Sequence, residues 1–196
     1  MGDIFLMRFK VSALWLVIII LISGCAESSS SISNENSDDF VEIRGHAQAG
    51  DPIAEYELGK SYFEGNGVDK DLSKAIQWFQ KSANSGIDDA QYTLAFLFSE
   101  GVYLQKDLKK AANWFELAAR QGHAESQYRL GLLYSKGQGI EKNISLAFAW
   151  FAFAEKGGKM ESRLELIQLR KSMSALEISE ALRTQKELEG VLRDHL

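Results

Sequence analysis

Hydrophobic and small residues recur at a constant spacing of 36 residues between Asp51 and Gly158. The clearest example is the pair Trp114-Phe115, which is preceded by Trp78-Phe79 and followed by Trp150-Phe151. When the 36-residue units are aligned, residues at the same position of each unit form a column. Further columns are Leu58, Leu94 and Leu130; Tyr62, Phe98 and Tyr134; Gly65, Gly101 and Gly137; Asp71, Asp107 and Asn143; and Ala75, Ala111 and Ala147. A period of about 20–50 residues is typical of stacked structural repeats. We therefore expect a repeat protein.

The first half of one unit predicts a helix that begins after Asp51 and ends at Gly65. Ala54, Leu58 and Tyr62 fall at positions i, i+4 and i+8, so they share one helical face. Asp51 is a suitable N-cap residue, and a glycine-rich loop follows the helix. Glycine recurs inside this helix, at Gly59 and Gly131, where it lowers helix propensity; close approach of a neighbouring helix explains its presence.

The second half predicts another helix, with Asp71 as its N-cap and Gly86 after its last turn. Its apolar stripe consists of Leu72, Ala75, Ile76 and Phe79. A pair of such helices cannot bury its apolar faces alone, whereas stacked pairs can. The sequence therefore predicts an all-α fold, an α-solenoid of helix–turn–helix repeats.

The recurring residues resemble the Sel1-like repeat, a slightly longer relative of the tetratricopeptide repeat. In the first unit they are Ala54, Leu58, Gly59, Tyr62, Gly65, Gly67, Val68, Asp71, Ala75, Trp78 and Phe79. The resemblance covers about residues 50–196 and implies three repeats, 51–86, 87–122 and 123–158. The second repeat departs from the pattern, because Tyr103 stands where Gly67 and Gly139 stand. Tyrosine suits a positive φ poorly, so we expect this loop to have another shape.

The two ends of the array are more polar than its centre, as terminal repeats commonly are. Residues 40–50 match the second half of a repeat without its Trp-Phe pair and predict an N-terminal capping helix. Residues 159–196 predict C-terminal capping helices; a separate partner-binding helix is the alternative. The last helix would begin at a capping box, Ser174 to Glu177, and would bury an apolar face. That face comprises Ile178, Ala181, Leu182 and Leu188.

The N-terminus has the features of an export signal. Arg8 and Lys10 precede a mostly apolar run at 11–22, which is short for a membrane span. Residues 22–25, Ile-Ser-Gly-Cys, resemble the lipobox of bacterial lipoproteins. That resemblance implies a signal peptide at 1–24 and lipidation of Cys25, and Ala26 implies the outer membrane, facing the periplasm. An ordinary cleaved signal, an uncleaved anchor and a start at Met7 are the alternatives.

Residues 25–39 are rich in Ser, Asn and acidic residues, which predicts a flexible tether. The formal net charge is −5 and no basic cluster is present, so nucleic-acid binding is not expected. Cys25 is the only cysteine, which excludes an intramolecular disulfide. Some cysteine-rich members of the family are described as binding penicillin-type compounds, but they carry paired cysteines in their repeats, and that property is not implied here.

Catalytic and metal-binding patterns are not found in the sequence. It contains no glycine-rich phosphate loop, no HExxH and no GxSxG motif. His46, His123 and His195 are isolated and are expected to be solvated; no metal or cofactor is expected. Asp88 and Asp89 are interpreted as charges at the start of a helix. We expect no enzymatic activity, with a cell-wall-active hydrolase as a remote alternative.

The function that the resemblance implies is protein–protein interaction, because stacked helix pairs form an extended surface for peptides, protein segments or, less often, glycans. An envelope-organising structural lipoprotein is the alternative. Partner-binding residues are expected on the first helix of each repeat, opposite Ala54, Leu58 and Tyr62. The candidates are Phe63, Phe96 and Tyr103. Tyr56, Tyr92 and Tyr128 recur there in every copy and are expected to pack between repeats. Trp114 lies in the central repeat with neighbours stacked on both sides, so Trp114→Ala is expected to destabilise the array more than Trp150→Ala near its end.

Overall fold

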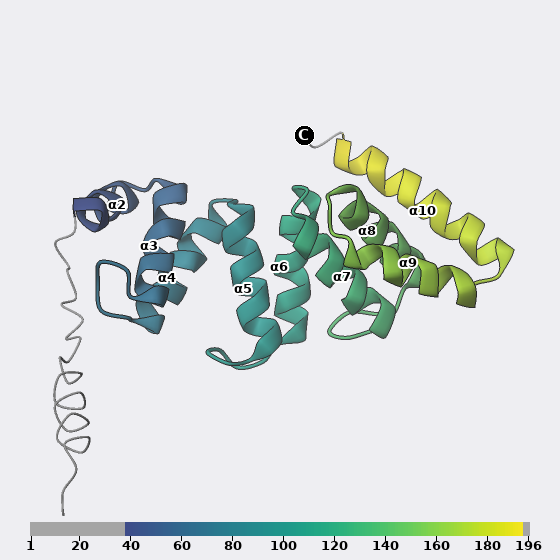
Figure 1. The fold of residues 1–196 in the computed structure, drawn as a ribbon, viewed down its shortest axis with the longest axis horizontal. Helices are drawn as coiled ribbons and strands as arrows, with labels where there is room; N and C mark the ends of the chain where they lie inside the picture. The colour runs from purple at the N-terminus through teal and green to yellow at the C-terminus, as the bar shows by residue number, and fades with distance from the viewer. Residues whose placement is uncertain (1–37, 194–196) are drawn as a thin grey trace, which may run out of the picture. The chain divides into compact units, whose positions relative to one another are not determined.

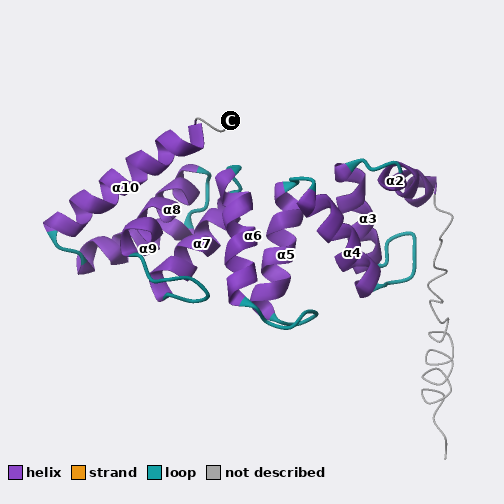
Figure 2. Ribbon diagram, turned by 180° about the vertical axis from the view of Figure 1, so that it is seen from behind, coloured by secondary structure: helices purple, strands orange, loops and turns teal. Residues whose placement is uncertain are grey.

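The computed structural model describes residues 38–193, and all regular structure in this range is helical (Figure 1). The helices are α2 (Asp38–Gln48), α3 (Pro52–Glu64), α4 (Leu72–Asn84), α5 (Asp88–Glu100), α6 (Leu108–Arg120), α7 (Ala124–Lys136), α8 (Ile144–Lys156), α9 (Glu161–Ser172) and α10 (Ala175–Arg193). The pairs α3–α4, α5–α6 and α7–α8 form three helix–turn–helix repeats. Figure 2 shows the long loops after α5 and α7 at one edge of the array and the short turns at the other. The all-α solenoid is thereby confirmed.

The ends of these helices follow from single residues in the repeated columns. Asp71, Asp107 and Asn143 each accept a hydrogen bond at 2.9 Å from the backbone N–H three residues later. This is the bond of an N-cap, and it satisfies an amide that the helix itself leaves unpaired. Gly65, Gly101 and Gly137 end the first helix of each repeat with φ between 67° and 83°, a conformation that glycine adopts without strain.

The phenylalanine of each Trp-Phe pair forms the centre of the core. Phe79, Phe115 and Phe151 are almost completely buried. A Cβ atom on Gly59 would lie 2.7 Å from the ring of Phe79, which explains the helical glycine in the first repeat. Gly131 has the same relation to Phe151. The prediction that these glycines permit close helix approach is confirmed.

The tryptophans of the three pairs are not equally buried. Trp150 is only 2% exposed, whereas Trp78 and Trp114 are half-buried. This burial argues against the expectation that Trp114 contributes more to stability than Trp150. The cause is α10, whose Leu188 and Leu192 pack into the cluster around Trp150. The C-terminal helix thus covers the tryptophan that would otherwise lie at the end of the array.

The C-terminal helices depart from the repeat. Helix α9 takes the place of a fourth first helix, with Leu166 buried, but α10 packs on α8 instead of completing the pair. The predicted capping box is present, because Ser174 and Glu177 exchange backbone and side-chain hydrogen bonds. Leu182 was predicted on the buried face of α10, but it is 47% exposed; Ala181 is the fully buried residue of this helix.

At the N-terminal end, α2 begins at Asp38, so the last two residues of the expected tether are helical. The predicted signal peptide at 1–24, Cys25 and the remainder of the tether lie outside the described residues. Phe40 of α2 is buried and packs edge to face on Tyr62, with ring centroids 5.9 Å apart. Among residues 38–193, no helix combines the length and the apolar character that a membrane span requires.

Candidate partner-binding site

A hollow of about 550 Å³ lies between α3, α5 and the loop after α5, and it is lined mainly by aromatic side chains. Phe63, Phe96 and Tyr103, the three candidates from the sequence, all line it. Its volume is within the range of about 300–1,000 Å³ that ligand pockets occupy. The structure therefore brings together residues from two repeats that are up to 40 positions apart.

The aromatic residues of the hollow differ in how firmly they are held. Phe63 and Tyr103 meet edge to face, with ring centroids 5.6 Å apart. Phe96 is 37% exposed and Tyr103 is 44% exposed. Beneath them, the buried ring of Phe79 contacts both Tyr56 and Phe63. Two exposed aromatic rings thus lie next to less exposed ones, Tyr103 on Phe63 and Phe96 on Tyr92, an arrangement typical of interaction hot spots.

The loop that carries Tyr103 has the altered shape that the sequence predicts. Gly67 and Gly139 have φ of 70° and 72°, whereas no non-glycine residue among those described has a positive φ. A Cβ atom on Gly139 would overlap the backbone of Leu108 in the preceding repeat. A tyrosine cannot make that approach, so the second repeat holds Tyr103 against Phe63 instead, where it forms one wall of the hollow.

The rim of the hollow includes charged residues that the sequence analysis did not single out. Lys60, Glu64 and Glu100 line it. The Lys60 ammonium lies 3.0 Å from the Glu57 carboxylate, and this hydrogen bond raises the pKa of Lys60. Val102, which is also exposed at the rim, was likewise missed. The signal available in the sequence was the column Glu64, Glu100 and Lys136, which changes sign in the third repeat.

The tyrosines expected to pack between repeats make their ring contacts mainly within their own repeat. Tyr56 contacts Phe79 at 5.7 Å, and Tyr128 contacts Phe151 at 5.8 Å, both between ring centroids. Tyr92 contacts Phe115 in the same way but also stacks on His123 of the next repeat, at 4.8 Å. Burial raises the pKa of all three tyrosines. Tyr56 and Tyr128 also pack in clusters that include Leu94 of α5 and Leu166 of α9, so all three tyrosines contact the next repeat or helix as expected.

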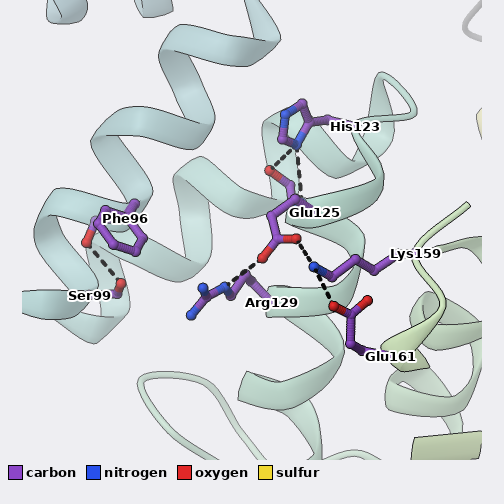
Figure 3. Close-up of polar contacts among 8 residues, drawn as sticks. Phe96, Ser99, His123, Glu125, Arg129, Lys159 and Glu161 are labelled. Atoms are coloured by element: carbon purple, nitrogen blue, oxygen red, sulfur yellow. Dashed lines mark hydrogen bonds and ion pairs between the residues drawn. The ribbon is translucent and has the colours of Figure 1, made fainter. Parts of the chain in front are cut away.

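Beyond the hollow, the surface of the third repeat is occupied by ion pairs (Figure 3). Arg129 lies over the ring of Phe96, 5.7 Å from its centroid, and pairs with Glu125 at 3.0 Å. Glu125 also pairs with Lys159, which in turn lies 3.4 Å from Glu161. Burial disfavours ionisation of Glu125, but hydrogen bonds from Lys159 and Arg129 outweigh it and lower the pKa of this carboxyl group. The charges of this region therefore neutralise one another.

His123 is not solvated as expected, because its side chain is only 17% exposed. Its Nδ1 accepts a hydrogen bond from the backbone N–H of Ser126, so the imidazole acts as the N-cap of α7. Its Nε2 lies 3.4 Å from Asp89 of the preceding repeat. His46 is exposed, and His195 lies outside the described residues. Residues 38–193 contain no group of three His, Cys, Asp or Glu side chains placed to hold a metal ion.

Comparison with known proteins agrees with this architecture. The Sel1 repeat profile matches residues 52–87, 88–123 and 124–159. The structure of a Sel1 repeat protein from Oxalobacter formigenes is 31% identical and superposes with a TM-score of 0.65, covering 67% of this chain and 99% of that protein. A protective antigen of uropathogenic Escherichia coli with an SLR fold is 26% identical, with a TM-score of 0.61; the match covers 72% of this chain but 32% of the antigen.

Helicobacter pylori cysteine rich protein B shares the fold at 22% identity and a TM-score of 0.50, over 62% of this chain and 92% of that protein. No curated protein sequence matches the chain. The fold and its repeats define a helical solenoid. The chain belongs to the Sel1 repeat family, whose model covers more than half of it. Sel1 repeat proteins are generally protein-interaction scaffolds and are typically not catalytic.

Proposed function

We propose that this protein is an envelope-anchored scaffold that binds a segment of a partner protein in the hollow between α3 and α5. The observation that carries the proposal is the pair of exposed aromatic rings, Phe96 and Tyr103, at a hollow of about 550 Å³. Exposed aromatic side chains on a firmly packed base supply much of the free energy of typical protein interfaces. Membership of a family of interaction scaffolds supports the same function.

The anchoring part of the proposal rests on the sequence alone. Lipidation of Cys25 would attach the chain to a membrane, and Ala26 favours the outer membrane by its resemblance to lipoprotein sorting signals. The residues between Cys25 and α2 would separate the repeats from the lipid by a polar tether. The binding surface would then face the periplasm, where partner proteins and the cell wall are both accessible.

The binding site is tested by in-cell crosslinking of the full chain carrying Phe96→Ala and Tyr103→Ala. We expect capture of the partner to fall while circular dichroism and melting temperature stay near the wild-type values. Leu117→Ala is the matched control, because Leu117 is an equally exposed apolar residue on α6 that does not line the hollow. Equal capture by all variants would contradict the site. Co-sedimentation with cell-wall sacculi in place of protein capture would favour the structural alternative.

A further inference from the structure

The two helices that border the hollow both end with a residue that the helix dipole disfavours. Helix α3 ends at Glu64 and α5 ends at Glu100, and neither has a basic residue in its last turn. The C-terminal end of a helix carries partial negative charge, so it favours a cation there. The equivalent residue of α7 is Lys136, which satisfies that preference. Of the three repeats, only the two that form the hollow end their first helix against this preference for a cation. Such violations are expected where function opposes stability.

Both glutamates line the hollow without an ion pair to any described residue, although Lys60 lies close enough for its charge to interact with that of Glu64. Within residues 38–193, neither carboxylate forms an ion pair; Glu64 accepts a hydrogen bond at 2.6 Å from the side-chain amide of Asn66. Lys60 is the one cation among the residues that line the hollow, and it pairs with Glu57. Lys70, outside the lining, lies 5.4 Å from the ring centroid of Phe63. The rim thus combines two carboxylates and two helix C-termini around an aromatic floor.

We infer that the partner segment places an apolar side chain in this hollow and a neighbouring lysine or arginine between Glu64 and Glu100. The inference rests on the proposed function and names the chemistry of the partner for the same site. The apolar side chain would cover the exposed rings of Phe96 and Tyr103. The adjacent cation would meet the two carboxylates and could also lie over an aromatic face.

The neighbouring surface does not offer the same site for an apolar residue beside a cation. At the third repeat, the cations Arg129 and Lys159 are already paired with Glu125 and Glu161, and Lys136 occupies the position of the two glutamates. An acidic segment would meet like charges at the rim, and like charges close together oppose binding. A purely apolar segment would bring no cation to the two carboxylates beside it. An apolar side chain next to a cation is the pattern that matches both features.

The test is a selection from a random peptide library against the full chain, purified in detergent micelles, followed by affinity measurements on the selected peptides. Four forms are compared: wild type, Phe96→Ser, the double variant Glu64→Gln with Glu100→Gln, and Glu141→Gln. Glu141 is an exposed glutamate in the loop of the third repeat and controls for the loss of negative charge. Removal of the rim charges relieves the unfavourable dipole contact, so lost binding in the double variant would not reflect lost stability.

We expect wild type and Glu141→Gln to enrich peptides with an apolar residue next to lysine or arginine. The double variant should keep the apolar preference, lose the basic one and bind the wild-type peptides about three- to tenfold more weakly, with little remaining salt dependence. Peptides that depend on Phe96 but show no basic preference would overturn this inference and leave the proposed function standing. Selection of no peptide that depends on Phe96 would overturn both.

Discussion

Trp150 and Phe153 pack edge to face with ring centroids 5.8 Å apart, in the cluster that α10 closes with Leu188 and Leu192. Trp114, one repeat earlier in the same register, packs against the same cluster but remains half-buried. The most buried tryptophan of the three pairs is therefore the one in the helix on which α10 packs. The central position of Trp114 in the array does not make it the most buried tryptophan.

Truncation of Trp150 should accordingly be the more damaging of the two tryptophan substitutions. Trp150→Ala removes a buried aromatic side chain, which typically costs about 3–5 kcal/mol of unfolding free energy. Trp114→Ala should cost less, because part of its ring is already in contact with water. Urea unfolding followed by circular dichroism measures both. A larger loss for Trp114→Ala would mean that α10 does not cover Trp150 in solution.

Replacement of His123 tests its role as the N-cap of α7. His123→Ala removes the acceptor for the Ser126 amide and should lower the unfolding free energy by about 0.5–2 kcal/mol. His123→Asn retains an N-cap acceptor and should recover part of that loss, although the stacking on Tyr92 is gone. Thermal melts of wild type, His123→Ala and His123→Asn measure these differences in stability. Identical losses for Ala and Asn would show that stacking, and not capping, is the contribution of the imidazole.

The ion pairs of Glu125 predict how stability responds to acid. Its folded pKa is lowered below the ordinary value of 4.5, so its contribution is complete above that value and is lost as the pH falls through the folded pKa. Glu125→Gln cannot ionise and has no such contribution. The difference in unfolding free energy between wild type and Glu125→Gln should therefore shrink as the pH falls below about 5. A difference that stays constant over this range would rule out the ion pairs as its source.

The lipid anchor is tested independently of the repeats. Wild-type protein should fractionate with membranes and carry an acylated N-terminal peptide, whereas Cys25→Ala should accumulate as an unprocessed precursor. Detergent partitioning measures the association with membranes, and mass spectrometry of the N-terminal peptide measures its acylation. Wild-type protein in the soluble periplasm without an acyl group would refute the anchor and leave the binding site unaffected.

The repeated sequence positions were sufficient to predict the helices of the repeats, because several of the boundaries depend on one local residue. Asp71, Asp107 and Asn143 cap helices as their side chains predict, and the helical glycines, Gly59 and Gly131, meet phenylalanine rings. The repeated positions could not predict how the C-terminal helix α10 packs, because α10 has no counterpart in the repeats. Its packing on α8 reverses the expected order of Trp114 and Trp150 and leaves Leu182 exposed.

The sequence predicted only part of the candidate site, because it shows departures from the repeat pattern but not contacts between repeats. Phe96 and Tyr103 stood out because they vary or break the repeat pattern, and both line the hollow. Glu64 and Glu100 were overlooked, although a glutamate in the last turn of a helix is already unusual. His123 was misjudged because its surroundings come from another repeat: the ring of Tyr92 and the carboxylate of Asp89. Contacts between repeats are not visible in the local pattern.

Site-specific photocrosslinking in living cells tests the central claim most directly. A photoreactive amino acid replaces Tyr103 at the hollow or, as a control, Leu117 on the outer face of α6, in the full chain. The account predicts that the probe at position 103 captures a discrete partner protein, that Phe96→Ser abolishes the capture, and that position 117 captures none of it. Capture of the same protein from position 117, or capture from position 103 that survives Phe96→Ser, would contradict a binding site between α3 and α5.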